Sequence, residues 1–292
     1  MWWSPLKVPI LCPERHQSLR GIFLSLFILF QIDKEEEMKR LESVAASLTL
    51  ALVLSFVLIS VERVLPAWAD DNNSRNGITI VEPGRTLFGK SYNQLAGELS
   101  NWTVAEPEAT NVAFDPDGRF CHLNQKGKVW FLAGTWLGGI TERTCEVPAG
   151  KAIFFALDSW VSFPPEFPEE GDPCADLPTL VEQIRCDVNE DLDVAPYLFL
   201  EVTIDGETIE DLFAYRAQSQ PGGFIFRIPE GSLLNEWGFT PGDRFPAVVD
   251  GYWILLKPMP PGSHTIKVVT TYPDGSSFGV NYTLLIPKRG RN

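Results

Sequence analysis

The sequence predicts a mainly β fold, an antiparallel β-sandwich or a jelly-roll-like barrel, on three observations. Short runs of β-branched and aromatic residues recur along residues 129–286 and are separated by turn residues. Two Asp-Gly pairs, at residues 205–206 and 274–275, stand between such runs and predict tight hairpins. Strands do not alternate with helices, which argues against a parallel α/β sheet and for a sandwich or barrel.

One N-terminal helix is expected before the strands, and it is amphipathic. Ser91 and Gln94 have the spacing of a capping box, in which two side chains satisfy backbone N–H groups at the start of a helix. Apolar residues then recur at helical spacing in one stripe, made of Tyr92, Leu95, Ala96, Leu99 and Trp102. We interpret this stripe as core packing rather than as a cofactor site.

The strands are expected at residues 129–136, 140–147, 151–160 and 197–204, from Glu207 onward, and at residues 251–257, 265–272 and 278–286. Residues 163–193 break this pattern with clustered prolines and acids, followed by a weakly helical stretch from Leu177 to Asp191. This segment is predicted to be an acidic, partly helical insertion or a lid.

The N-terminal part of the chain predicts export. From Met38, a basic start precedes an apolar run at residues 44–61 and the small-x-small triplet at residues 67–69, which is the order of a secretory signal peptide. The expected division is residues 1–37 as an upstream mis-start or leader, 38–69 as the signal peptide and 70–292 as one exported domain. Two alternatives stay open: the apolar run is kept as a membrane anchor, or residues 1–37 form a membrane-active leader.

The charge of the exported part limits its partners. From Asp70 onward, 17 Lys and Arg side chains stand against 31 Asp and Glu side chains, a net charge of −14. Such a surface repels phosphate backbones and anionic lipid headgroups, so we expect no nucleic-acid partner and no membrane partner after signal cleavage. The expected location is extracytoplasmic, either periplasmic or secreted, and the partner is an unknown ligand or envelope component.

Four cysteines remain after residue 69, and an even count in an oxidising compartment predicts disulfides. We favour Cys121 with Cys145 and Cys174 with Cys186, because each pair closes a local unit without a long crossing. Zinc binding by four thiols is the competing use, but no C-x-x-C pair or His spacing supports it.

Several motifs resemble one family. They are Gly89–Tyr92, Cys121–Gln125, Val129–Thr135, Arg143–Cys145, Val147–Phe155, Asp250–Trp253 and Pro260–Ile266. Together they resemble a family of exported bacterial proteins of uncharacterised function, over most of residues 88–270. The chain departs from this pattern in the helix, where Leu95 and Leu99 stand in place of further tryptophans. The resemblance implies export but brings no activity, ligand or catalytic residue.

The common catalytic motifs are missing from the sequence. It contains no G-x-S-x-G, P-loop, H-E-x-x-H or G-x-G-x-x-G pattern, and only His122 and His264 follow residue 69. No catalytic residue is therefore assigned. Asp115 and Asp117 followed by Gly118 resemble the start of a calcium loop, but Lys126 occupies the twelfth position, where a carboxylate is needed. An Asp-rich turn is the favoured interpretation, calcium is a weak alternative, and no other cofactor is predicted.

The candidate binding residues are His122, Gln125, Trp136, Arg143 and Trp160. The first four lie in the block from Cys121 to Lys151, where a disulfide-pinned hairpin would hold polar side chains in place. Trp136 and Trp160 stand next to loop residues, where an indole can stack on a ligand. The competing interpretations are an ion pair of Arg143 with Glu142 or Asp158, and core packing of the tryptophans. If these residues bind a ligand, the Arg143→Ala and Trp136→Ala variants will keep their melting temperature and lose the ligand.

Three classes of function are compatible with these features: an exported binding or interaction module, which we favour, an exported hydrolase with a carboxylate- or His-based site, and a structural envelope protein. Fold alone does not decide among them. A concave pocket with a histidine beside carboxylates would favour the hydrolase, whereas a shallow aromatic face would favour the binding module.

Overall fold

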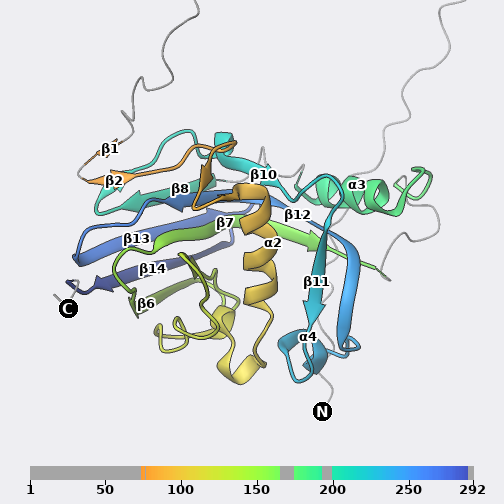
Figure 1. Ribbon diagram of the computed structural model, residues 1–292, viewed down its shortest axis with the longest axis horizontal. Coiled ribbons are helices and arrows are strands. Elements are labelled where there is room, and N and C mark those ends of the chain that lie inside the picture. Colours follow the sequence, from red (N-terminus) through yellow and green to blue (C-terminus); the bar gives the residue numbers. More distant parts are fainter. Residues whose placement is uncertain (1–73, 76, 165–173, 193–198, 289–292) are drawn as a thin grey trace, which may run out of the picture. The chain divides into compact units, whose positions relative to one another are not determined.

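The computed structural model describes residues 74–75, 77–164, 174–192 and 199–288 (Figure 1). The strands are β1 (Ser74–Arg75), β2 (Ile78–Thr79), β3 (Thr86–Leu87), β4 (Lys90–Ser91), β5 (Val129–Leu132), β6 (Ile140–Glu146), β7 (Ala152–Ser162), β8 (Phe199–Ile204), β9 (Glu207–Thr208), β10 (Arg216–Gln218), β11 (Phe224–Ile228), β12 (Gly242–Leu256), β13 (Gly262–Thr271) and β14 (Ser277–Ile286). The helices are α2 (Tyr92–Thr103), α3 (Leu180–Leu192) and α4 (Leu233–Glu236), with 3-10 turns η1 (Glu108–Thr110), η2 (Val112–Phe114) and η4 (Leu212–Tyr215). The predicted signal peptide, the leader and the cleavage point at Asp70 lie outside the described residues.

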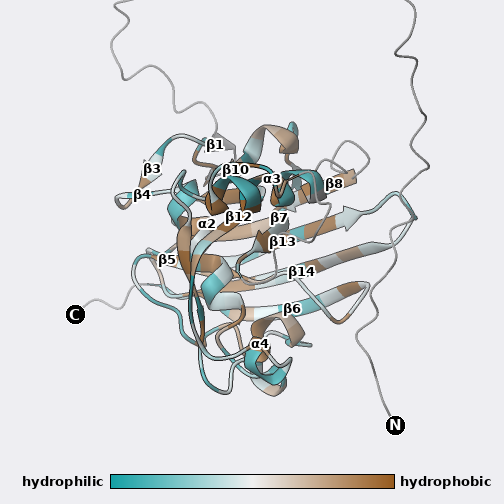
Figure 2. Ribbon diagram, turned by 90° about the vertical axis from the view of Figure 1, so that its right-hand side faces the viewer, coloured by the Kyte–Doolittle hydropathy of each residue, from teal (hydrophilic) through white to brown (hydrophobic). Residues whose placement is uncertain are grey.

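Two sheets form the body of the fold, which confirms the mainly β, sandwich-like class. One sheet has the order β10-β12-β7-β5, and β11 also pairs with β12. The other has the order β6-β14-β13-β8-β9, and β13, β14 and β6 run side by side in Figure 2. Most pairs are antiparallel, but β5 with β7 and β6 with β14 are parallel. Each sheet is therefore a mixed sheet, with one parallel strand pair among antiparallel pairs.

The main core lies between the sheets. Along β6 buried and exposed residues alternate strictly, as the two-residue period of a strand requires when one face is covered. The facing core side chains include Ile153 and Phe155 of β7, Ile254 and Leu256 of β12, Ile204 of β8, Ile266 of β13 and Leu284 of β14. Because β7 and β12 are covered on both faces, long stretches of both strands are continuously buried.

Helix α2 covers the outer face of the sheet that contains β7 and β12 (Figure 1). Its predicted capping box is present: Ser91 Oγ accepts the Gln94 N–H, and Gln94 Oε1 accepts the Ser91 N–H. The predicted apolar stripe is buried against Phe154 and Trp253, whose rings stack 5.6 Å apart. Tyr92 also accepts the Leu255 N–H through its hydroxyl, at 3.0 Å. The stripe is therefore core packing, as predicted.

Helix α3 belongs to the predicted acidic insertion, of which residues 165–173 and 193 lie outside the described residues. Ile184 and Val188 are completely buried in the main core. Asp187 accepts a hydrogen bond from Ser162 of β7 at 2.7 Å. The described part of the insertion is therefore docked on the sandwich.

Both predicted disulfides are present, Cys121–Cys145 and Cys174–Cys186. The first joins the loop after η2 to β6, and the second joins the segment before α3 to the helix itself. Disulfides persist in oxidising compartments, so they indicate an extracytoplasmic environment. Among the described residues, no helix has the length and apolar character needed to span a membrane.

Strand β12 begins earlier than the sequence predicts. A strand was expected from Gly251, but β12 already begins at Gly242. Residues 242–250 contain charges and Pro246, and a proline lacks the N–H that a central strand needs. The register of β11 against β12 shifts between Phe224 and Phe226, beside Pro246, so the proline sits at an irregularity of the ladder. Tertiary pairing with β11 and β7 therefore overrides the local signal.

Candidate binding surface

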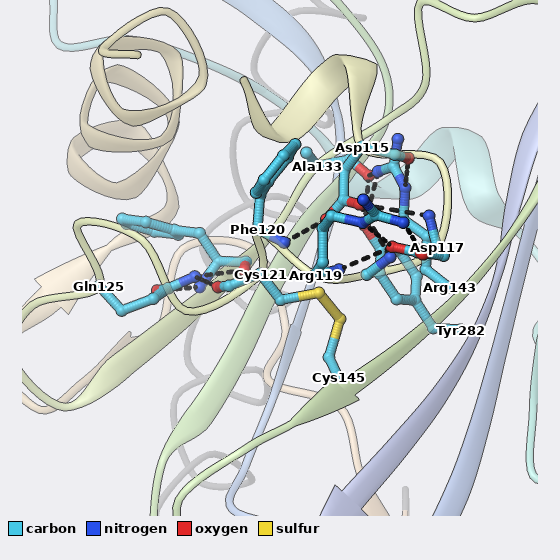
Figure 3. Close-up of a disulfide and its surroundings, with 12 residues drawn as sticks. Asp115, Asp117, Arg119, Phe120, Cys121, Gln125, Ala133, Arg143, Cys145 and Tyr282 are labelled. Atoms are coloured by element: carbon cyan, nitrogen blue, oxygen red, sulfur yellow. Dashed lines mark hydrogen bonds and ion pairs between the residues drawn. A yellow bond between two sulfur atoms is a disulfide. The ribbon is translucent and has the colours of Figure 1, made fainter. Parts of the chain in front are cut away.

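Arg143 lies inside the protein, on the inward face of β6, and is only 2% exposed. Its guanidinium donates to the Asp115 carbonyl at 2.7 Å, to the Ala113 carbonyl at 3.2 Å and to the carbonyls of Ala133 and Gly134 at 3.1 and 3.0 Å. Figure 3 shows this arrangement beside the Cys121–Cys145 disulfide.

Tyr282 completes the surroundings of Arg143. Its hydroxyl accepts a further hydrogen bond from Arg143 at 3.0 Å and itself donates to the Ala133 carbonyl at 2.7 Å. An ion pair of Arg143 with Glu142 or Asp158 is not found among the described residues. Arg143 therefore joins two loops from within.

The two candidate calcium ligands are already engaged by the protein. Asp115 is buried and accepts the N–H groups of Asp117, Gly118 and Phe120 at 3.2, 2.9 and 2.7 Å. Asp117 is exposed and pairs with Arg119 at 2.6 Å, and this hydrogen bond lowers the pKa of Asp117 to about 2. Both carboxylates thus serve an Asp-rich turn.

Gly118 shows why this turn needs a glycine. Its φ is +96°, and an added Cβ would lie 2.3 Å from the Thr144 carbonyl oxygen. A side chain at this position would therefore clash with the backbone of β6. The turn is held directly against β6, next to the Cys121–Cys145 disulfide.

Gln125 and His122 differ in their surroundings. Gln125 donates to the carbonyls of Cys121 and Phe131 at 3.0 and 2.8 Å, and its Oε1 accepts the Phe131 N–H at 3.0 Å. It thereby pairs with the edge of β5. His122 is exposed and makes no hydrogen bond to a described residue. Among the described residues, no hydrogen bond links either side chain to Trp136 or Trp160.

Trp136 is part of an exposed aromatic cluster that local sequence signals do not predict. It is 45% exposed, and Trp237, which follows α4, is 50% exposed. The two indoles stack with centroids 5.6 Å apart and an angle of 29°, and Phe114 packs edge-on against Trp136 at 5.7 Å. We call Phe114, Trp136 and Trp237 the aromatic surface. It is built from three segments that are distant in sequence.

Hydrogen bonds inside the protein hold the segments that carry Phe114 and Trp136. Arg143 donates to the carbonyls on both sides of Phe114 and to those of the two residues that precede Thr135. The Trp136 N–H donates to the Ala113 carbonyl at 2.9 Å. Arg143 is therefore a positioning residue: its buried guanidinium holds the backbone segments that carry Phe114 and Trp136.

Helix α4 is fixed beside the segment that follows α2. The Leu233 N–H donates to the Glu106 carbonyl at 2.9 Å, and Glu236 Oε2 accepts the Glu108 N–H at 2.7 Å. Leu234 is buried in a small cluster with Phe226 of β11. These contacts fix the position of α4 and therefore of the backbone at Trp237, whose indole is half exposed.

Trp160 does not join this surface. It is 51% exposed at the end of β7 and pairs across the sheet with Asp250. It makes no ring contact to another described residue. Of the five residues predicted to bind, Trp136 and Arg143 are linked through the Ala113 carbonyl, to which both donate, whereas Trp160 stands apart.

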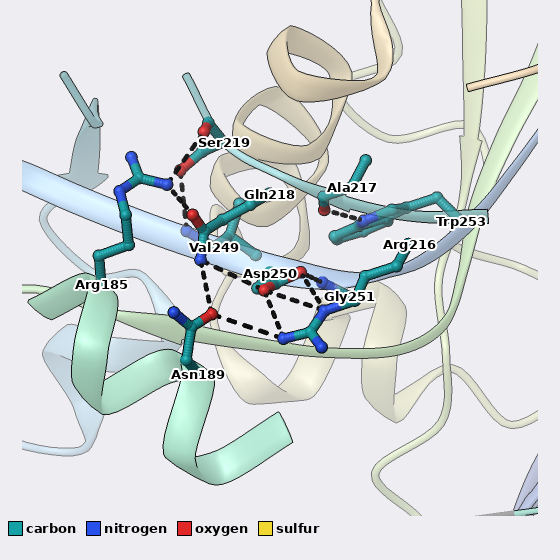
Figure 4. Close-up of polar contacts among 10 residues, drawn as sticks. All are labelled: Arg185, Asn189, Arg216, Ala217, Gln218, Ser219, Val249, Asp250, Gly251 and Trp253. Atoms are coloured by element: carbon teal, nitrogen blue, oxygen red, sulfur yellow. Dashed lines mark hydrogen bonds and ion pairs between the residues drawn. The ribbon is translucent and has the colours of Figure 1, made fainter. Parts of the chain in front are cut away.

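A second polar cluster lies between α3 and β10 (Figure 4). Asp250 is buried and accepts from Arg216 at 2.9 Å and from Gln218 at 3.2 Å, while Asn189 of α3 accepts from Gln218 at 3.1 Å. An open hollow of about 560 Å³ is lined by these residues and Ala217. Because the side chains bind one another, we assign the cluster to docking of α3 on the sheet.

His264 is also used within the fold. Its Nδ1 lies 2.7 Å from Asp205 Oδ2 and its Nε2 lies 2.8 Å from the Pro260 carbonyl oxygen, while Asp205 Oδ1 accepts the Thr265 N–H at 2.7 Å. These contacts tie the Asp-Gly turn after β8 to the start of β13. Neither histidine lines the hollow beside α3.

Asp158 carries a partly desolvated carboxyl group in the middle of β7, at the register shift between β7 and β12. Its Oδ1 accepts a hydrogen bond from the Tyr272 hydroxyl at 3.2 Å, and it pairs across the sheet with Tyr252. Burial raises the pKa of Asp158 above its ordinary value. The folded protein therefore holds this proton more tightly than the unfolded chain does.

This shift predicts a pH-dependent effect of the Asp158→Asn substitution. Above the folded pKa the wild type carries a buried charge that lowers its stability, and below the unfolded pKa, about 4, both states are protonated. We expect the variant to unfold at a higher temperature than the wild type near pH 7 and at a similar temperature near pH 3, measured by thermal unfolding at both values. A lower melting temperature of the variant near pH 7 would contradict this.

Comparisons with protein-family models, with curated proteins and with solved structures found no match to this chain.

Proposed function

We propose that this chain is an exported, periplasmic or secreted binding module whose ligand contacts the aromatic surface. The observation that carries the proposal is the stacked, half-exposed pair Trp136–Trp237. Tryptophans at the centre of binding surfaces supply large, rigid contact areas, because an indole loses little conformational freedom when it is covered.

The support beneath this pair fits the proposal. Arg143, the Asp115 turn and the Cys121–Cys145 disulfide hold the loops that carry Phe114 and Trp136. A ligand then meets side chains whose backbone is already ordered, which lowers the entropy lost on binding. A shallow aromatic face is also the feature that favours a binding module over a hydrolase.

The test is a binding screen with the purified exported protein against three probe classes: neutral oligosaccharides, basic peptides and apolar peptides, read out by thermal shift and titration calorimetry. We expect the wild type to bind at least one class and the Trp136→Ala/Trp237→Ala variant to lose it. Trp160→Ala is the matched control, since it removes an equally exposed indole elsewhere. Absence of binding to all classes, or unchanged binding by the double variant, would refute the proposal.

A further inference from the structure

The three segments that build the aromatic surface have a one-sided charge. Residues 104–115, 133–139 and 229–239 contain four glutamates and Asp115, and they contain no Lys, Arg or His. Asp115 is buried in its turn. The other four, Glu106, Glu108, Glu230 and Glu236, give these segments a net negative charge, against which the buried Arg143 beneath them supplies one positive charge.

These glutamates are not neutralised by the protein. Among the described residues none of the four forms an ion pair. Glu108 and Glu236 are exposed, and a hydrogen bond holds the Glu236 carboxylate against the backbone N–H of Glu108. Glu236 directly precedes Trp237 in sequence. The Trp237 indole and the Glu236 carboxylate thus belong to neighbouring residues, and that carboxylate is bonded to the backbone of η1.

We propose that the partner of the aromatic surface is a basic polypeptide segment, whose Lys or Arg side chains lie over Trp136 or Trp237 and pair with Glu108 and Glu236. This inference rests on the proposed function and names its ligand class. A cation is attracted to the face of an indole more strongly than to other aromatic rings. The carboxylates also attract Lys and Arg side chains, and the net charge of −14 steers a cationic partner toward the protein.

Other ligand classes fit this surface less well. Anionic lipids, nucleic acids and acidic polysaccharides are repelled by the same carboxylates. A neutral oligosaccharide can stack on the indoles but gains nothing from the uncompensated charge. Charge complementarity therefore selects a basic chain, in which several cations can meet glutamates on both η1 and α4.

The experiment titrates the exported protein with a synthetic peptide of alternating lysine and glycine, with its glutamate-containing counterpart and with a neutral oligosaccharide. We expect only the basic peptide to bind, with an affinity that falls at least about tenfold between low and high salt. The Glu108→Gln/Glu236→Gln variant should bind about tenfold more weakly, because Gln keeps the acceptor for the Glu108-position N–H but removes the charge. Trp136→Ala/Trp237→Ala should abolish binding.

The matched control is Glu146→Gln/Glu201→Gln, which makes the same charge change at exposed positions of β6 and β8. It should bind the basic peptide like the wild type; equal weakening in both pairs would show unspecific charge attraction and overturn the inference. Salt-independent, tryptophan-dependent binding of the oligosaccharide would overturn the basic partner while the proposed function stands. If none of these probes binds in a tryptophan-dependent way, the basic partner is refuted, and the proposed function fails as well only if the apolar peptides of the first screen do not bind either.

Discussion

The Arg143→Ala variant is expected to lose about 3–5 kcal/mol of the free energy of unfolding, because the substitution leaves several buried carbonyl groups without a donor. Arg143 is 2% exposed and donates to four carbonyls and to Tyr282. For a domain of this size, the loss corresponds to a decrease in melting temperature on the order of 10 °C. Denaturant unfolding followed by circular dichroism measures it.

Arg119→Ala is the matched control, since Arg119 is exposed and pairs only locally with Asp117. It should unfold almost like the wild type. Arg143→Lys should be intermediate, because an ammonium group cannot reach carbonyls on both sides as a planar guanidinium does. If Arg143→Ala unfolds like Arg119→Ala, the buried network does not support the loops. The sequence predicted that Arg143→Ala would keep its melting temperature if Arg143 bound a ligand. Because Arg143 is buried, we now expect this variant to lose stability.

The second large effect is expected at Trp253, in the layer between α2 and the sheet. Trp253 is completely buried, stacks on Phe154 at 5.6 Å and donates from Nε1 to the Ala217 carbonyl at 2.8 Å. Trp253→Ala should reduce the free energy of unfolding by about 3–5 kcal/mol, because it leaves a cavity and an unpaired carbonyl. Equilibrium unfolding in urea provides the measurement.

Trp253→Phe separates the two contributions. A phenyl ring keeps most of the stacking on Phe154 but lacks the indole N–H, so this variant should lose about 1–3 kcal/mol. A Trp253→Ala variant within about 1 kcal/mol of the wild type would contradict the packing of α2 against β12.

The parts of the fold that follow from local signals were predictable. Ser91 and Gln94 place the start of α2 because a capping box involves only neighbouring residues. The Asp-Gly turn at residues 205–206 lies between β8 and β9, and Cys121 and Cys174 each pair with the cysteine next along the chain. These features need only short-range geometry.

Other parts depend on contacts between distant segments. The first half of β12 contains Pro246 and charged residues, and its pairing with β11 and β7 is not encoded locally. Trp237 contacts Trp136 only because α4 docks beside the segment after α2. An arginine on an alternating strand such as β6 is expected to be exposed or paired with an acid, whereas Arg143 is surrounded by carbonyl groups. Trp136, Trp237 and Arg143 therefore acquire their roles from tertiary structure.

The central claim, that a partner covers the aromatic surface, is tested most directly by oxidative footprinting of the tryptophans with mass spectrometry. The protein, produced from Asp70 onward, would be labelled alone and with an envelope extract of the cells in which it occurs. Trp136, Trp237 and Trp160 have similar exposure, so each serves as a reference for the others. We expect the extract to protect Trp136 and Trp237 together and to leave labelling of Trp160 unchanged; protection of Trp160 alone, or of none of the three, would contradict the account.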